Sequence, residues 1–203
     1  MSLYKIKPRF QDFLRPIAAR LFRAGVRANQ VTIVACIVSV ALGIWLATGA
    51  SEPVVFLLVP IWLFIRMAFN AIDGMLAREF GQASSLGAYL NELADVISDC
   101  AIYLPFALLP GSSLWLVLAV ILLSIISEMA GVLGVMVGAS RRYDGPMGKC
   151  DRALVFGLLG VLVGFGAPVG NAFAAIWSVL AILIGATVVN RVRNGLGELA
   201  RTR

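Results

Sequence analysis

The feature that most constrains this chain is a series of long apolar segments separated by short polar turns. Its residues are 60% hydrophobic and only 14% charged, whereas soluble domains have about 45–50% apolar and roughly 25% charged residues. So much apolar surface cannot be buried inside one small globule, and a bilayer is its natural solvent. The segments fall at 31–49, 54–72, 88–109, 114–138, 153–168 and 172–192. We therefore predict an all-α membrane protein with six transmembrane helices.

Residues 1–28 differ from the apolar segments because basic, aromatic and aliphatic side chains are mixed there. Apolar residues recur at helical spacing with arginines around them, which is typical of an amphipathic helix lying in the headgroup region. The apolar positions are Phe10, Phe13, Leu14, Ile17 and Leu21. We therefore expect an interfacial helix (1–28), a six-helix membrane domain (29–193), for which Asn29 would be the first N-cap, and a cytoplasmic tail (194–203).

The placement of the 17 basic residues indicates the orientation. Seven precede the first apolar segment, Arg66 and Arg78 lie at or after the end of the second, four lie in 141–152 and four follow residue 190. The alternate turns contain no Lys or Arg. Because cytoplasmic loops carry the excess of basic residues, both termini are predicted to be cytoplasmic, in a protein integral to the inner membrane. Its net charge of +6 then indicates contact with anionic membrane lipids, and no nucleic-acid partner is expected.

Histidine is absent from the chain, so acid–base chemistry must come from carboxylates, lysines or tyrosines. The absence also argues against lipid synthases related to phospholipase D and against membrane phosphatases related to the acid phosphatases, since both depend on histidine. Cys36, Cys100 and Cys150 show no C-x-x-C spacing, so a disulfide framework or a zinc site is not expected.

Polar side chains gather at the cytoplasmic ends of the second and third apolar segments. They are Asn70 and Asp73 on the second and Asn91, Glu92, Asp95 and Asp99 on the third. Residues three, four, seven or eight positions apart lie on the same face of a helix, so the members of each set share a face. The short turn between the two segments places both sets at the same depth in the membrane. Ionised carboxylates inside a membrane are costly and normally have a partner or a function.

Divalent cations explain this group of carboxylates more simply than ion pairs do, although some of the carboxylates could be neutralised by Arg66, Arg78, Lys149 and Arg152. Asp and Asn oxygens are hard ligands suited to Mg²⁺ or Mn²⁺. Such ions would bridge the phosphates of a substrate and stabilise a leaving group. Gly74 lacks bulk, as does Ala77, and both would let a flat base or a pyrophosphate approach the backbone.

At these residues the chain resembles a known family. The string Asp73-Gly74-x-x-Ala77-Arg78-x8-Gly87-x3-Asn91-x3-Asp95 resembles the D-x-x-D-G-x-x-A-R-x8-G-x-x-x-D-x-x-x-D signature of the CDP-alcohol phosphotransferases, or CDP-alcohol phosphatidyltransferases. The resemblance extends over essentially the whole chain. Asn29-x-x-Thr32 looks like the family motif at the start of the first span, and Gly145-Pro-Met-Gly148-Lys149 is similar to a Gly-Lys loop of the branch that uses glycerophosphate.

The resemblance implies a role for each matching position. Asp73 would be a metal ligand, and Asp95 would be both a ligand and the general base that deprotonates the acceptor hydroxyl. The donor nucleotide would contact Gly74, Ala77, Arg78 and Gly87, with Asn29 and Thr32 from the first-span motif. The chain departs from the signature at Asn70 and Asn91, which replace aspartates. Asn offers a metal a carbonyl oxygen without charge, so cation affinity should fall unless Glu92 or Asp99 restores it.

Several residues keep two interpretations. Asp99 is an accessory ligand or a structural acid paired with Arg66 or Arg152, and Glu128 has a packing role or an acceptor-site role. The basic residues near the fifth and sixth segments enforce topology or bind phosphates of donor or acceptor; for the second role the candidates are Lys149, Arg152 and Arg191. Gly134/Gly138 and Gly160/Gly164 permit close helix contact, within the chain or in a homodimer.

The leading hypothesis is an enzyme of phospholipid biosynthesis. It would transfer a phosphatidyl group from CDP-diacylglycerol to an alcohol acceptor, with Mg²⁺ or Mn²⁺, and release CMP. A second enzymatic reading uses a soluble CDP-alcohol and a lipid acceptor. A third makes the chain a degenerate member that binds CDP-lipid without turnover, and the fourth is a small transporter, which would spread its acids across the bilayer.

Overall fold

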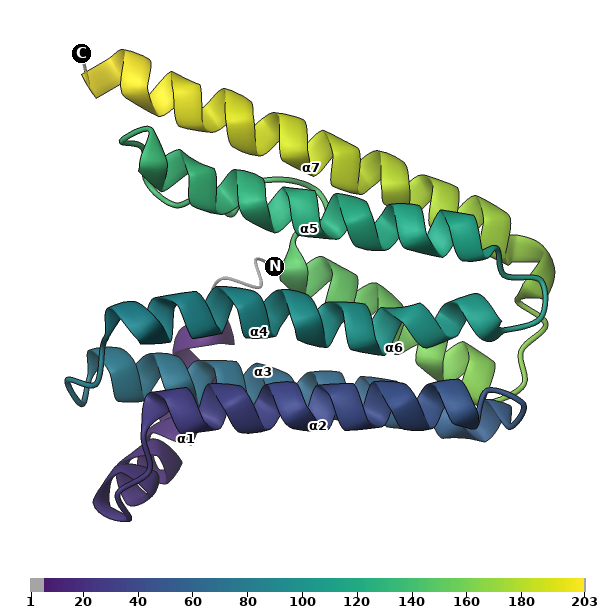
Figure 1. The fold of residues 1–203 in the computed structure, drawn as a ribbon, viewed down its shortest axis with the longest axis horizontal. Coiled ribbons are helices and arrows are strands. Elements are labelled where there is room, and N and C mark those ends of the chain that lie inside the picture. The colour runs from purple at the N-terminus through teal and green to yellow at the C-terminus, as the bar shows by residue number, and fades with distance from the viewer. Residues whose placement is uncertain (1–5, 203) are drawn as a thin grey trace. The chain divides into compact units, whose positions relative to one another are not determined.

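The computed structural model describes the chain from residue 6 to residue 202, and within that range it is helical with no strand. The all-α prediction is thus confirmed. In chain order the elements are α1 (Ile6–Arg23), α2 (Ala28–Thr48), η2 (Pro53–Leu57), α3 (Leu58–Arg78), α4 (Ser85–Tyr103), η3 (Leu104–Leu108), α5 (Leu114–Met136), α6 (Lys149–Gly164), η4 (Gly170–Ala172) and α7 (Phe173–Thr202), the η elements being short 3-10 helices (Figure 1).

Four of the described helices are long and apolar enough to cross a membrane, where the sequence led us to expect six. They cover Ala28–Thr48, Pro53–Arg78, Leu114–Met136 and Gly170–Arg201. The third and fifth predicted spans fall on α4 and α6, which are not among these four by length and composition. The 19-residue α4 carries three acids, and α6 has 16 residues, a length of about 24 Å, which is short for a bilayer core of about 30 Å.

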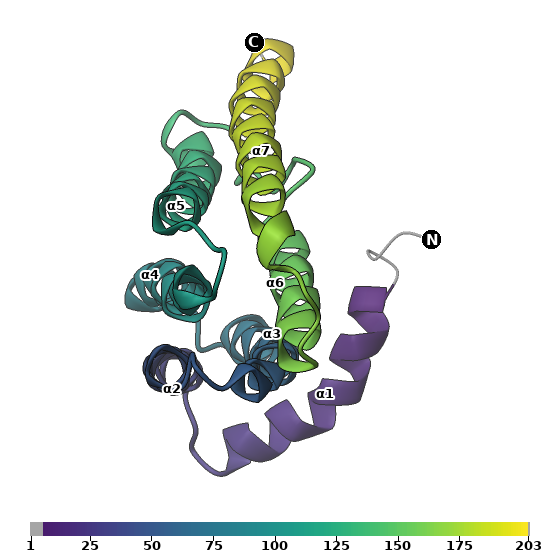
Figure 2. The same ribbon diagram turned by 90° about the vertical axis from the view of Figure 1, so that its right-hand side faces the viewer.

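The chain forms two compact units whose boundaries fall inside α2, α3 and α4. The first comprises residues 1–41 and 61–98, and the second comprises residues 42–60 and 99–203. In the first unit, α1 runs across the direction of α2 (Figure 2). One face of α1 enters a core cluster shared with the start of α2 and the end of α3, whose buried members are Leu14, Ala18, Ala28, Val31, Ile72, Met75 and Leu76.

The other face of α1 leaves large apolar side chains uncovered. Phe13 is 72% exposed, and Ile17 and Phe22 are also exposed. The helix is therefore apolar on both faces, one of them packed and the other open, with arginines between them. Arg15 connects α1 to the end of α3, because its Nε donates to Glu79 at 2.9 Å.

In the second unit, α5 and α7 pack side by side along much of their lengths (Figure 1). Its core is aromatic: the ring of Phe156 stacks on Tyr103, with ring centroids 3.7 Å apart, and on Trp177, with centroids 5.6 Å apart. Trp177 in turn stacks on Phe173.

The paired glycines are used for packing within this unit. A Cβ at Gly160 would lie 2.8 Å from the Phe56 carbonyl oxygen, and a Cβ at Gly164 would lie 2.5 Å from Leu57 Cγ, so both admit η2 against α6. At Gly134 a Cβ would lie 3.1 Å from the carbonyl oxygen of Ser140. Close packing inside the chain therefore accounts for these three small residues.

Candidate functional site

Asp73 lies on α3 and is 6% exposed. Its Oδ2 accepts a hydrogen bond from the Thr32 hydroxyl of α2 at 2.9 Å. Thr32 is itself buried and comes from the first turn and a half of α2. The fold therefore brings the first-span motif and the signature aspartate into direct contact, although 41 residues separate them in the sequence.

Asp95 lies on α4 and contacts two side chains of α3. Its Oδ1 accepts hydrogen bonds from Asn70 Nδ2 and from Arg66 Nη2, each at 3.3 Å. Arg66 also donates to the Asp95 backbone carbonyl at 3.0 Å. The amide of Asn70 can donate to a carboxylate, whereas the ionised aspartate that the signature places there could only repel it. The substitution thus creates a contact as well as removing a charge.

Two signature glycines are each covered by a side chain. A Cβ at Gly74 would lie 2.8 Å from Arg78 Nη2, so the Arg78 guanidinium folds back over the bare backbone of α3. At Gly87 a Cβ would lie 2.8 Å from Asn29 Oδ1 and 3.0 Å from Ser84 Oγ. In this structure the groups that approach Gly74 and Gly87 belong to the protein, and the predicted approach of a nucleotide to these positions stays a prediction.

The start of α2 is also held by the turn between α3 and α4. The Ala28 N–H donates to Gln82 Oε1 at 2.7 Å, and Gln82 Nε2 donates to the Val26 carbonyl at 3.3 Å. The helix begins at Ala28, so Asn29 lies inside its first turn and is not the N-cap. Sequence reasoning missed Gln82, because a glutamine in a polar turn has no distinguishing pattern.

Three other predicted site residues of α3 and α4 lie within about one helical turn of Asp73 or Asp95 but are less buried than Asp73. Asn91 and Glu92 precede Asp95 by about one turn of α4 and are half-buried, and Ala77 packs at the edge of the core cluster. Among the described residues, no group of three or more His, Cys, Asp or Glu side chains could hold a metal ion. A cation bound at Asp73 and Asp95 would therefore need amide or hydroxyl oxygens as ligands beside the carboxylates.

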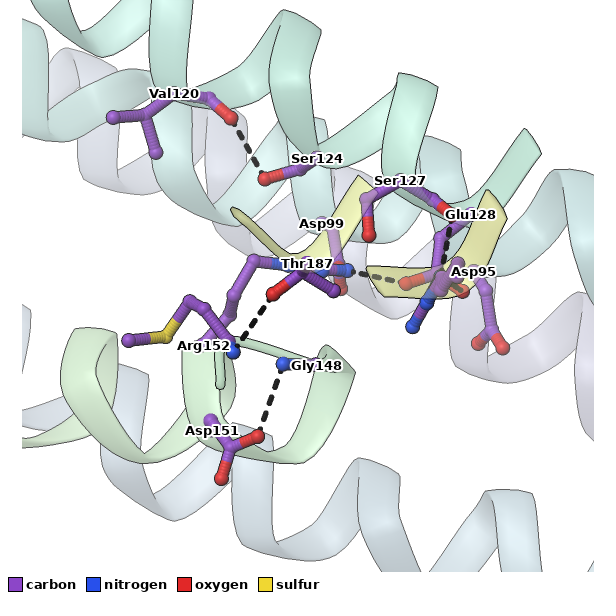
Figure 3. Close-up of polar contacts among 12 residues, drawn as sticks. Asp95, Asp99, Val120, Ser124, Ser127, Glu128, Gly148, Asp151, Arg152 and Thr187 are labelled. Carbon is purple, nitrogen blue, oxygen red and sulfur yellow. Dashed lines mark hydrogen bonds and ion pairs between the residues drawn. The ribbon is translucent and has the colours of Figure 1, made fainter. Parts of the chain in front are cut away.

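A buried ionic network occupies the second unit (Figure 3). Arg152 is fully buried, and its Nη2 donates to Asp99 Oδ2 at 3.2 Å and to Glu128 Oε1 at 3.0 Å. Arg152, one of the two arginines considered for Asp99, therefore contacts it. In the described part of the chain, the Nε and Nη1 of Arg152 are buried with no hydrogen-bond acceptor.

Glu128 is the carboxylate at the centre of this network. Besides Arg152, it forms ion pairs with Arg191 on α7, at 3.4 Å, and with Arg141 on the loop after α5, at 3.9 Å. Arg191 also donates to the carbonyl oxygens of Ser127 and Asp144. Three basic side chains from three segments thus satisfy one buried acid, as the cost of burying a charge requires.

The loop before α6 is held in place by two hydrogen bonds, both visible in Figure 3. The Met147 N–H donates to Thr187 Oγ1 at 2.9 Å, and the Gly148 N–H donates to Asp151 Oδ2 at 3.0 Å. Gly145 has φ +126° with Thr187 packed against it, a conformation and a closeness that favour glycine. These contacts fix half-buried Lys149 at the first position of α6.

The fold and the site together define a helical integral membrane protein in which acids and amides of α2, α3 and α4 form a polar cluster. The sequence model of CDP-alcohol phosphatidyltransferase matches residues 26–192, and the chain belongs to this family. The resemblance is thereby confirmed, and with it the class of enzyme: a membrane transferase of phospholipid biosynthesis.

Relatives and solved structures agree with this assignment. The chain is 47% identical over 196 residues to the inner membrane protein YnbA of Escherichia coli K12, and the aligned residues cover 97% of each chain. It is 29% identical to the phosphatidylinositol phosphate synthase of Mycobacteroides abscessus, over 94% of this chain and 88% of the relative. The phosphatidylinositol phosphate synthase PgsA1 of Mycobacterium tuberculosis has the same fold. Its complex with manganese and citrate superposes with a TM-score of 0.73 at 24% identity, covering 89% of this chain and 88% of that one, and a second structure has CDP-DAG bound.

Proposed function

We propose that this protein transfers a phosphatidyl group from CDP-diacylglycerol to an alcohol acceptor and releases CMP, in a metal-dependent reaction. The observation that carries the proposal is the gathering of the motif side chains in the first unit: Thr32 against Asp73, and Asn70 with Arg66 around Asp95. The family membership supports it, as do the relatives that are phosphatidylinositol phosphate synthases. The acceptor is an alcohol.

The donor atoms present suit a hard divalent cation such as Mg²⁺ or Mn²⁺. Carboxylate and amide oxygens are the ligands these ions prefer, and a bound cation would compensate the charge of the buried Asp73 carboxylate. We propose that the ligands come from Asn70, Asp73, Asn91 and Asp95, with Glu92 or Asp99 adding charge. Bound there, the cation would supply charge stabilisation for the diphosphate and the leaving CMP.

We propose Asp95 as the general base. Its carboxylate lies 3.3 Å from Arg66 Nη2, and Arg66 also donates to the Asp95 backbone carbonyl. Asp95 takes the proton of the acceptor hydroxyl, whose oxygen attacks the phosphorus that carries diacylglycerol. The bond from that phosphorus to the bridging oxygen breaks, and the electron pair leaves with CMP.

On the donor side, we propose that the nucleotide diphosphate is held by the signature positions Gly74, Ala77, Arg78 and Gly87, with Asn29 and Thr32. Arg78 lies over Gly74, and Asn29 lies over Gly87, so a polar side chain borders each stretch of bare backbone. We further propose that Lys149 and Arg152 bind phosphate. The two buried Arg152 nitrogens without an acceptor in the described residues support this role.

We also propose that α4 and α6 cross the inner membrane as well, which gives six spans with both termini and the site on the cytoplasmic side. The arrangement follows the distribution of basic residues. The similarity to an inner membrane protein supports the location.

The decisive experiment incubates the purified protein with CDP-diacylglycerol, a panel of alcohols and Mg²⁺ or Mn²⁺, and identifies products by mass spectrometry. The proposal predicts CMP together with one phosphatidylated alcohol. The variant Asp95→Asn should still bind CDP-diacylglycerol but release no CMP. Binding without CMP release from the unaltered chain, whatever the acceptor, would instead favour a degenerate member, for which Asn70 and Asn91 are the motivating observation.

A further inference from the structure

A basic groove lies at the C-terminal end of α7 in the second unit. Its volume is about 330 Å³, and it is lined by Arg142, Arg193, Asn194, Gly197, Glu198 and Arg201. All but one of these residues follow one face of α7, at spacings of one, four, five and eight residues, and the other comes from the loop after α5. Three arginines against one glutamate leave the lining positive.

The wall of the groove that faces the loop is held by interactions within the protein. Glu198 accepts hydrogen bonds from the Ser140 N–H at 2.9 Å and from the Ser140 hydroxyl at 2.8 Å, and it pairs with Arg142. Arg142 in turn makes a two-pronged contact with Asp144, at 2.8 and 3.0 Å. These bonds satisfy the acid of the groove, so its charge is largely neutralised locally.

The other two arginines are exposed and have no such contacts. In the part of the chain that the structure describes, neither Arg193 nor Arg201 has a carboxylate or hydrogen-bond partner. They lie eight residues apart on α7, a rise of about 12 Å. Midway between them, Gly197 has nothing within 4 Å of the place where a Cβ would stand, so the floor of the groove is open.

The position of the groove along α7 indicates the kind of anion that would occupy it. The helix has no charged residue from 173 to 190, and its arginines begin at Arg191. Beside the groove, Val192 and Leu196 are 48% and 59% exposed, so apolar and basic side chains alternate where the apolar stretch of the helix ends. This combination matches an amphiphile whose phosphate meets guanidinium groups while its acyl chains lie along apolar side chains.

We propose that this groove is a binding site for the phosphate-bearing headgroup of an anionic phospholipid. Arg193 and Arg201 bind the phosphate, and Gly197 leaves room for it between them. The proposal does not depend on the reaction that the protein catalyses.

The charge test uses the full-length protein in detergent, with bound lipids counted by native mass spectrometry during titration with phosphatidylglycerol or phosphatidylcholine. The unaltered chain should bind one phosphatidylglycerol in preference to phosphatidylcholine. R193Q/R201Q should weaken that binding about tenfold or more, because each basic residue contributes substantially to anionic lipid binding. The matched control R20Q/R23Q removes the same charge from exposed positions of α1 and should retain the tight site.

The shape test leaves every charge in place. Gly197→Leu fills the floor of the groove, whereas Gly185→Leu adds the same side chain elsewhere on α7, where a Cβ also meets nothing within 4 Å. Only Gly197→Leu should weaken phosphatidylglycerol binding, and neither variant should unfold. Undiminished binding in both R193Q/R201Q and Gly197→Leu would overturn the proposal, as would equal losses in R193Q/R201Q and R20Q/R23Q. Competition by inorganic phosphate or glycerol phosphate at the concentration of lipid that saturates the site would assign the groove to a water-borne anion instead.

Discussion

The guanidinium group of Arg66 holds Asp95 by two different atoms, donating to the side-chain Oδ1 at 3.3 Å and to the backbone carbonyl at 3.0 Å. Both residues lie in helices, on α3 and α4, and Arg66 is only 4% exposed. Arg66 therefore fixes both the charge and the position of the proposed base.

Replacing Arg66 should separate positioning from stability. Both bonds come from Arg66 Nη2, and the lysine nitrogen ends about one bond short of that position. Arg66→Lys therefore keeps a cation but should lengthen both contacts, so we expect CMP release to fall by about 10²-fold, within the range for losing an effective general base. Arg66→Ala also leaves Asp95 without its cation and should lower the thermal midpoint further. Turnover and thermal midpoints of both variants should be compared, and normal turnover in Arg66→Lys would contradict the positioning role.

Restoring the signature aspartate at position 70 should make the thermal stability of the protein depend on a divalent cation. Asn70→Asp removes the amide that donates to Asp95 and adds a negative charge beside it. Without divalent cations we expect a lower thermal midpoint than for the unaltered chain, and with Mg²⁺ or Mn²⁺ we expect recovery. A thermal midpoint that does not change with metal in this variant would place the cation elsewhere.

Adding one methyl group at Gly74 should impair function more than folding. The Cβ would meet the far end of the Arg78 side chain, which can move aside. We therefore expect Gly74→Ala to leave the thermal midpoint nearly unchanged but to weaken CDP-diacylglycerol binding about tenfold. Gly185→Ala, where the added methyl meets nothing within 4 Å, is the control and should bind normally.

Removing the buried cation of the second unit should destabilise the protein. Arg152→Gln leaves Asp99 and Glu128 with less compensation, and breaking a buried pair costs about 3–5 kcal/mol. The control variant Arg193→Gln removes one positive charge from an exposed position and should unfold at the same temperature as the unaltered chain. The check is denaturation in detergent, and equal midpoints would show that the network contributes no stability.

The contact between α1 and α3 should respond to acid. The hydrogen bond from Arg15 lowers the pKa of Glu79 below its ordinary value of 4.5. A lowered pKa in the folded state contributes stability above the unfolded pKa, and the contribution disappears as the pH falls through the folded pKa. The difference in thermal midpoint between the unaltered chain and Glu79→Gln should therefore be present at about pH 7 and be lost as the pH falls below 4.5 and through the lowered pKa of Glu79. A difference that persists in acid would assign it to packing.

Local spacing predicted which residues share a helix face, but not which helices supply their partners. The period of three and four residues placed Asp95 and Asp99 on one face, and the structure pairs Asp95 with Arg66 of α3 and Asp99 with Arg152 of α6. Those pairings join residues 29 and 53 positions apart, and they depend on how the helices pack. Hydropathy identified the apolar segments well, but it could not show where each helix ends, and α4 ends at Tyr103 although the predicted apolar segment runs over 88–109. The contact of Asn29 with Gly87 could not be predicted from the sequence either, because it forms only when the start of α2 packs beside the start of α4.

The core cluster of the first unit sets a practical limit on trimming the chain. The family match begins at residue 26, yet Leu14 and Ala18 of α1 are buried with Met75 and Leu76, which follow Asp73 and Gly74 on α3. A fragment cut to the matched segment would expose the back of the motif helix to solvent or detergent. A fragment that keeps this core intact must therefore include α1 and is longer than the region that defines the family.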